Sequence, residues 1–353
     1  MPIKYLGSKR KLISSIMSVV TDTGARTALD AFTGTTRVAQ AMKRGGLLVT
    51  ASDIATYSKV FADCYIATDA EGIDMGELSD VISHLMSLPG EEGYFTETFC
   101  ERSRFVQPRN GRRVDAMRSA IEDEYVNSPL YPILLTSLIE ATDRVDSTTG
   151  VQMAYLKKWA ARSNNDIELR VPDLIPGTGQ SVLGDVFDVI DAVDKQDLIY
   201  LDPPYNQHRY FTNYHIWETL VRWDAPECYG VACKRMDSRD DETKSVFNKK
   251  REAPKALYRL FDACYPKCDT LVVSYNDESW IDKPTMSTAL FKAGFDDVCV
   301  LEFDYDRYVG ARIGIYNPSG DKVGKVSHTR NHEYIYVAGP SEQVEHIRDT
   351  IRA

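Results

Sequence analysis

Residues 197–205 read Asp197-Leu198-Ile199-Tyr200-Leu201-Asp202-Pro203-Pro204-Tyr205, an apolar β-rich run that ends on an acid and two prolines. Consecutive prolines cannot continue a central strand, because proline lacks an N–H group and has a fixed φ angle. The strand is therefore predicted to stop at Asp202, which places its carboxylate beside the Pro203 carbonyl. Two acceptors at one point match the two hydrogens of a planar –NH2 group. The alternative is an ordinary strand-end turn in which Asp202 acts as a cap.

Such a pair of acceptors would activate an exocyclic amine, which is a poor nucleophile because its lone pair is delocalised into the ring of the base. Holding both hydrogens favours a pyramidal nitrogen that can attack the methyl group of a sulfonium donor in line. The donor is already activated, so the protein supplies mainly position and electrostatics. The ring of Tyr205 offers a stacking surface to a base that has left its duplex at a cost of about a few kcal/mol.

Six further short apolar runs alternate with helical patterns along the chain, at 27–32, 47–54, 181–184, 270–275, 298–303 and 334–337. This alternation predicts a doubly wound α/β fold. We expect a Rossmann-like, mostly parallel sheet that ends in an antiparallel edge strand. Its domain would be built from residues 1–56 and 164–353.

The alternation breaks between residues 57 and 163, where no strand pattern occurs. Ser128 and Pro129 are typical of the cap and first turn of a helix, and Pro132 also falls within that turn. We therefore predict an inserted helical domain over 57–163. Apolar residues recur there three and four apart, as on one helix face, in two sets: Val114, Met117, Ile121 and Tyr125, then Leu130, Leu134, Leu138 and Ile139.

The net charge of −10 argues mildly against a nucleic-acid partner, but the positive charges are clustered. Segments 1–13, 101–118 and 234–259 each hold four more basic than acidic residues, and local patches decide phosphate binding. The polar stretch 225–253 is too long for an ordinary loop and predicts a DNA-contacting arm. The alternative for each basic segment is a solvated face.

The loop that follows the first strand, residues 28–34, holds one glycine, Gly34. A dinucleotide-binding loop uses three glycines to approach a pyrophosphate, so this loop suits a cofactor without phosphates. Asp30 can orient the turn or reach an ammonium group. Asp53 ends the next strand, where its oxygens can accept both ribose hydroxyls unless it is only a turn or cap residue. Asp185, after the following strand, can accept from an adenine amine.

Some kinds of protein are disfavoured by what the sequence lacks. No apolar run of about 18 residues predicts a membrane span, and the polar, basic start of the chain does not resemble a signal peptide. The seven cysteines form no CxxC pair and have no zinc spacing, so we expect reduced thiols. His328 and His332 have no ligand partners at metal spacing, and we predict no metal site.

With these motifs in view, the chain resembles the D12 class of adenine-specific DNA methyltransferases, the Dam-type enzymes. The resemblance covers most of the sheet-forming part of the chain. Tyr5 stands where a Trp is common in the family. The matching segments occur in the family's order: Lys4-Tyr-Leu-Gly-Ser-Lys9, Asp30-Ala-Phe-Thr-Gly34, Asp53, Asp185, Asp202-Pro-Pro-Tyr205 and, more weakly, Ser274-Tyr-Asn276.

The resemblance implies a class I methyltransferase that uses S-adenosyl-L-methionine to methylate adenine N6 of a flipped base in duplex DNA. It also implies that the helical block 57–163 is the target-recognition region. The implied catalytic residues are Asp202, Pro203, Pro204 and Tyr205. The implied cofactor-binding residues are Tyr5, Lys9, Asp30, Phe32, Gly34, Asp53, Asp185 and Asp202.

Contacts with DNA phosphates are expected from basic residues near the motifs and in the basic segments. His208 is a candidate general base or phosphate contact. Phe211, Tyr214 and Trp217 are expected either to pack as helix core or to hold the extruded base. The basic residues chosen are Lys9, Arg10, Arg112, Arg113, Arg209, Lys249 and Lys250.

Three alternatives stay open. The acceptor pair suits any exocyclic amine, so cytosine N4 in DNA or a base in RNA is the nearest rival substrate. A non-catalytic nucleic-acid-binding module with a relict cofactor fold is the second, and a nicotinamide enzyme, disfavoured by the missing glycines, is the third. We expect a monomeric, cytoplasmic, prokaryotic or phage-encoded enzyme with double-stranded DNA as its partner. Whether a restriction endonuclease accompanies it is left open.

Overall fold

The computed structural model describes residues 3–207, 209–277, 279–306 and 330–352. Its main sheet has seven strands in the order β3-β2-β1-β4-β7-β9-β8. The strands are β1 (Thr27–Asp30), β2 (Leu48–Asp53), β3 (Gln180–Leu183), β4 (Gln196–Leu201), β7 (Cys268–Asn276), β8 (Asp297–Asp306) and β9 (Arg330–Gly339). The predicted α/β fold with a mostly parallel sheet is confirmed, and each of the seven predicted runs coincides with a strand.

Parallel pairing joins β1 to β4, β2 to β3 and β4 to β7, whereas β9 runs antiparallel to β7 and β8. The edge pairing is thus antiparallel, as predicted. The strand that reverses direction is β9, second from the edge, and β8 forms the edge itself. Four consecutive residues of β4, from Leu198 to Leu201, are buried, as expected for a parallel strand covered on both faces.

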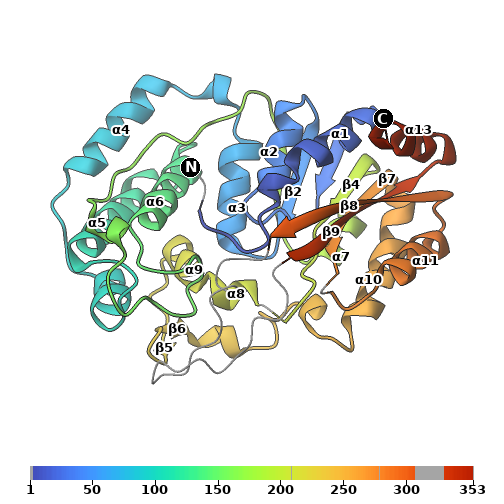
Figure 1. Cartoon of the computed structure of the whole chain (residues 1–353). Helices are drawn as coiled ribbons and strands as arrows, with labels where there is room; N and C mark the ends of the chain where they lie inside the picture. Colours follow the sequence, from blue (N-terminus) through green and yellow to red (C-terminus); the bar gives the residue numbers. More distant parts are fainter. Residues whose placement is uncertain (1–2, 208, 278, 307–329, 353) are drawn as a thin grey trace. The chain divides into compact units, whose positions relative to one another are not determined.

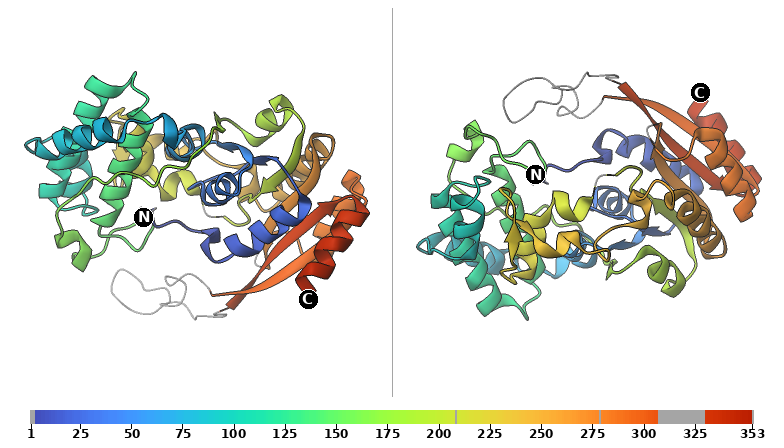
Figure 2. Two further views of the ribbon diagram at one scale, coloured as in Figure 1. Left: turned by 90° about the horizontal axis from the view of Figure 1, so that it is seen from above. Right: turned by 90° about the horizontal axis from the view of Figure 1, so that it is seen from below.

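The chain divides into two compact units. The second unit comprises Ser14–Phe32, Phe187–His208 and Ser245–Ala353. Within it, α10 packs beside α11 (Figure 1), and α13 lies along β8 and β9 (Figure 2). The helices whose residues lie mostly in this unit are α1 (Ile13–Thr23), α7 (Val186–Ala192), α10 (Ala253–Cys264), α11 (Lys283–Ala293) and α13 (Ser341–Arg352).

The first unit comprises Met1–Ile13, Thr33–Val186 and Arg209–Lys244. Within it, α5 packs between α4 and α6 (Figure 1), and a small hairpin joins β5 (Cys228–Tyr229) to β6 (Lys234–Arg235). Its helices are α2 (Arg37–Arg44), α3 (Thr56–Ala62), α4 (Met75–Ser87), α5 (Pro108–Tyr125), α6 (Tyr131–Arg144), α8 (Tyr210–Asn213) and α9 (His215–Arg222).

Short helical turns complete both units. Two are π-helical, Asp63–Ala67 and Thr96–Glu101. The 3-10 turns are Lys9–Lys11, Ala70–Gly72, Ala161–Asn164, Met236–Arg239, Val246–Asn248 and Tyr265–Lys267.

The block 57–163 is helical, and within it only an isolated bridge between Thr148 and Tyr155 is extended. One detail of the prediction is wrong, because α6 begins at Tyr131 and Pro129 lies before it. Ser128 Oγ accepts from the Leu130 N–H at 3.1 Å and so shapes the turn ahead of the helix. Pro132 is in the first helical turn, as expected. The domain boundaries stay a prediction.

All seven cysteines are free. In the described ranges, no helix combines the length and apolarity that a membrane crossing requires. The same part of the chain contains no group of three or more metal-ligating side chains.

Candidate active site

The strand that carries the catalytic motif, β4, ends at Leu201, one residue before Asp202. Asp202 is half-buried, Pro203 is buried, and the ring of Tyr205 is half-buried. Tyr205 meets Tyr275, which lies on β7, edge to face, with ring centroids 6.0 Å apart. The strand therefore stops where the two prolines require it to, and Tyr205 has a fixed aromatic neighbour.

The weaker motif Ser274-Tyr-Asn276 occupies the end of β7. Tyr200 on β4 and Ser274 share a hydrogen bond of 2.7 Å between their hydroxyl groups. The ends of the two strands are thus linked through side chains as well as through the sheet.

The end of β1 carries two of the predicted cofactor residues. Asp30 is 1% exposed, and the next residue donates its N–H to the Tyr200 carbonyl on β4 at 3.1 Å. The half-buried ring of Phe32 meets Phe247 at 5.5 Å, edge to face, and Phe187 stacks on Phe247 at 6.2 Å. Sequence reasoning overlooked Phe187 and Phe247. Phe187 lies two residues after Asp185. Because Asp185 is predicted to accept from an adenine amine, the nearby ring could have been predicted as an apolar surface for that adenine.

In the first unit, Asp53 closes the turn after β2 with both carboxylate oxygens. Its Oδ2 accepts from the Gly34 N–H at 2.9 Å and its Oδ1 from the Ala55 N–H at 3.0 Å. Desolvation raises the pKa of Asp53, and these N–H groups oppose that shift. A carboxylate has about four acceptor sites, so a turn role for Asp53 is compatible with binding hydroxyl groups as well.

Asp185 lies near Asp53 through the pairing of β2 with β3. Asp53 is in register with Leu183, and the Gly184 N–H donates to the Asp53 carbonyl at 3.0 Å. Asp185 itself is exposed. Gly34, Asp53 and Asp185 thus meet in one place, as expected for the carboxyl ends of neighbouring strands.

The N-terminal motif packs against the same loop. Gly34 has a φ of +51°, and a Cβ at Gly34 would lie 3.2 Å from both Cε1 and Oη of Tyr5. The absence of a side chain at Gly34 therefore lets the Tyr5 ring pack closely against this loop. Burial of the Tyr5 hydroxyl raises its pKa well above the usual value, and the neighbouring Tyr57 and Asp53 add to this shift.

Tyr5 stacks on two rings that follow the catalytic motif in sequence. Its centroid lies 4.6 Å from that of Tyr214 and 5.4 Å from that of Tyr210. The Tyr214 hydroxyl accepts from the Leu6 N–H at 2.6 Å. Tyr214 and Trp217 are 1% and 2% exposed, so they pack as core, and Phe211 is half-buried.

The basic residues predicted to contact phosphates lie in varied surroundings. Lys9 is 5% exposed, whereas Arg10 and Arg209 are exposed. Several of the others already have partners: Arg112 binds Glu92 at 2.5 Å, Arg113 donates to the Met86 carbonyl, Lys249 lies 3.5 Å from Glu252, and Lys250 lies over the Trp280 ring. Residue 208, the candidate base, is outside the described residues.

A family model described as D12 class N6 adenine-specific DNA methyltransferase matches residues 5–288. The chain belongs to this family. The matched D12 segment begins at Tyr5 and extends beyond β7, so it contains every cofactor and catalytic residue predicted above.

Curated relatives of this D12 chain are modification enzymes. Modification methylase StsI of Streptococcus sanguinis is 28% identical over 331 residues, 88% of this chain and 50% of the relative. Type II methyltransferase M.FokI of Planomicrobium okeanokoites is 26% identical over 87% of this chain and 50% of the relative. Type II methyltransferase M.NlaIII of Neisseria lactamica is 26% identical over 95% and 98%. The chain spans half the length of the first two relatives.

Proposed function

We propose that this D12 chain is a site-specific DNA methyltransferase that transfers a methyl group from S-adenosylmethionine to adenine N6. The observation that carries the proposal is the motif Asp202-Pro203-Pro204-Tyr205 directly after β4, within a family match that covers most of the chain. Asp202 Oδ and the Pro203 carbonyl accept the two amine hydrogens, and Tyr205 stacks the flipped base. S-adenosylmethionine supplies an activated methyl group.

The donor set of the first unit suits this cofactor. Asp53 and Asp185 offer carboxylate oxygens to ribose hydroxyls and to an adenine amine, and Gly34 admits Tyr5 to the same loop. Tyr5 and Lys9 contribute an aromatic ring and a cation from the N-terminal motif. In the second unit taken by itself, Asp30 ends β1, and Phe32, Phe187 and Phe247 form a group of apolar rings.

Double-stranded DNA is the proposed partner, with phosphate contacts from the exposed cations Arg10 and Arg209 and from the arm 225–253. Affinity should then fall steeply with salt, with a slope of about −0.9 per phosphate contact. A flat salt response would remove these residues from the interface. We also propose that the enzyme is monomeric and cytoplasmic. Relatives named modification methylase and type II methyltransferase support the further proposal that a cognate restriction endonuclease accompanies it.

The test is nucleoside mass spectrometry of DNA and RNA incubated with the chain and S-adenosylmethionine. We expect N6-methyladenine in DNA and its loss in Asp202→Ala. The matched control is Asp197→Asn at the other end of β4, where Asp197 Oδ2 accepts from the Arg26 and Thr27 N–H groups at 2.7 and 3.0 Å. N4-methylcytosine alone, or methylated RNA alone, would contradict the proposed substrate. DNA binding without any methylation would favour a relict module.

A further inference from the structure

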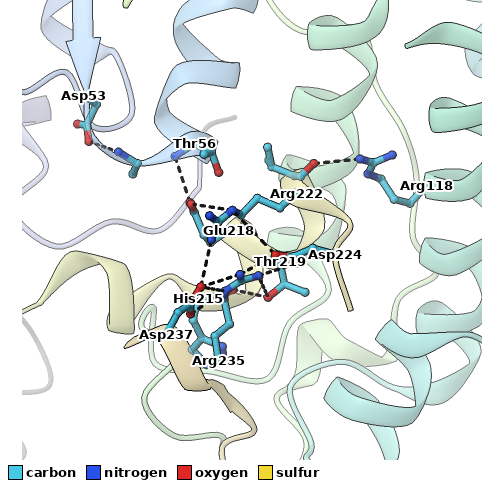
Figure 3. Close-up of polar contacts among 12 residues, drawn as sticks. Asp53, Thr56, Arg118, His215, Glu218, Thr219, Arg222, Asp224, Arg235 and Asp237 are labelled. Atoms are coloured by element: carbon cyan, nitrogen blue, oxygen red, sulfur yellow. Dashed lines mark hydrogen bonds and ion pairs between the residues drawn. The ribbon is translucent and has the colours of Figure 1, made fainter. Parts of the chain in front are cut away.

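Glu218 lies on α9, is 2% exposed, and accepts from the Thr56 N–H through Oε2 at 3.1 Å (Figure 3). Thr56 is the first residue of α3, whose N-cap residue, Ala55, provides no side-chain hydrogen bond. The first N–H groups of a helix lack partners within the helix and are stabilised by an acceptor with negative charge. Glu218 therefore supplies, from a helix 162 residues away in sequence, an acceptor that the local sequence does not provide.

The turn that Glu218 holds is the one formed by Asp53. Asp53 Oδ1 accepts from the Ala55 N–H, so acceptors from Asp53 and Glu218 bind the successive N–H groups of Ala55 and Thr56 (Figure 3). Tyr57 comes next, is fully buried, and has its hydroxyl 3.5 Å from that of Tyr5. A displacement of the Thr56 backbone would therefore change the positions of both Asp53 and Tyr5.

Glu218 is held in turn by a charged network. Arg222 lies 3.9 Å from Glu218 and 3.1 Å from Asp237. Arg235 on β6 is 2% exposed, donates to both oxygens of Asp224 at 2.7 Å, and also binds Asp237 at 2.8 Å (Figure 3). Of these charges only Glu218 and Arg235 are buried, whereas Arg222, Asp224 and Asp237 are 31–39% exposed. A buried acid is costly to displace from its partners, so burial and the bond to the Thr56 N–H give Glu218 a defined position.

We infer that Glu218 is a positioning residue for the methyl donor. It acts by holding the Asp53–Thr56 turn at the N–H group next to the one that Asp53 binds. The inference rests on the proposed function, because it takes Asp53 as the ribose-binding acid. Glu218 acts on binding of the donor, whereas Asp202 and Tyr205 act on the methyl transfer.

The experiment compares the full-length wild type with Glu218→Ala and Glu218→Gln. The control is Asp115→Ala, because Asp115 is also a buried acid (3% exposed) of the first unit that accepts N–H groups at a helix start, those of Phe95 and Thr96. For each protein we would measure the Kd of S-adenosylmethionine by calorimetry, KM and kcat with DNA, Tm, and hydrogen exchange of residues 53–58.

Glu218→Ala should raise Kd and KM for S-adenosylmethionine roughly tenfold, the size expected for a hydrogen bond to a charged group, and leave kcat within about threefold. Glu218→Gln keeps a carbonyl acceptor and should recover most of that loss. Amides at 53–58 should exchange faster in Glu218→Ala even without cofactor. Asp115→Ala should lower Tm without raising Kd.

Unchanged Kd and exchange in a folded Glu218→Ala would overturn the inference, and so would an equal loss of affinity in Asp115→Ala. If Glu218→Ala fails to fold, Glu218→Gln is the deciding variant. A tenfold loss of affinity for S-adenosylmethionine in Glu218→Gln, with unchanged hydrogen exchange at residues 53–58, would also contradict the inference. Failure of the proposed function is distinct, because the wild type would then not bind S-adenosylmethionine and Asp53→Ala would have no effect.

Discussion

Two acids at strand ends of this molecule, Asp202 directly after β4 and Asp53 as the last residue of β2, are followed by very different backbones. Two residues after Asp53, the Ala55 N–H donates to the Asp53 carboxylate. Two residues beyond Asp202 is Pro204, which has no N–H group to donate. A strand-end acid thus accepts from the N–H two residues on in one region, whereas in the other region that position has no N–H to donate. A proline pair therefore removes the local N–H donor that a strand-end carboxylate would otherwise accept from.

The largest expected effect is on Asp202. Replacing it by Asn puts a donor where an acceptor is needed, and kcat should fall by about 10²–10³-fold, as for loss of one preorganised polar group. Single-turnover methylation measures this loss. Asp197→Asn should leave kcat nearly unchanged, and a similar loss in both variants would show that the effect comes from the strand and not from the acceptor.

Pro204→Ala tests the comparison most directly, because it gives Asp202 the N–H donor that Asp53 has in Ala55. Competition from that donor should lower kcat by roughly tenfold, the size of one net hydrogen bond. Steady-state kinetics of methyl transfer is the measurement. Pro129→Ala, which changes a proline in the turn before α6, should have no such effect. Full activity of Pro204→Ala would mean that the missing N–H group is not what matters.

Gly34→Ala tests the other region. The added Cβ would meet the Tyr5 ring at 3.2 Å, and φ is +51°, so stability should fall by about 1–2 kcal/mol and KM for S-adenosylmethionine should rise severalfold. Urea unfolding and kinetics measure the two effects. Gly24→Ala has a similar φ of +67° but no atom within 4 Å of the new Cβ. It should lose stability and keep KM, and equal KM values in the two variants would remove Tyr5 from the explanation.

The smallest effect concerns pH. The folded-state pKa of Asp53 is raised by desolvation, so the folded protein holds this proton more tightly than the unfolded chain does. Relative to Asp53→Asn, the wild type should therefore lose stability as pH rises from about 4 through the folded pKa, measured by urea unfolding. The wild type should show the same trend relative to Asp115→Asn, because the pKa of Asp115 is also raised by desolvation. Only Asp53→Asn should weaken cofactor binding. The opposite slope would contradict the assignment.

The sequence by itself was sufficient for features that depend on covalent structure and local periodicity. The end of β4 at Leu201, one residue before the predicted stop at Asp202, follows from two prolines. Helices α5 and α6 follow from apolar spacing, although Pro129 was wrongly placed inside α6. The strand ends at Asp30 and Asp53 were also predicted, because the length of an apolar run indicates where a buried strand ends.

Only the tertiary structure decided which side chains from distant segments meet. The stack of Tyr5 on Tyr214, the pairing of Arg112 with Glu92, and the bond from Thr56 to Glu218 have no local signal. A periodic pattern states which face of an element is buried but not what lies against it. The physical reason is that long-range contacts depend on how whole elements pack, so the same acid reads alike in sequence whether it holds a ligand, a turn or another helix.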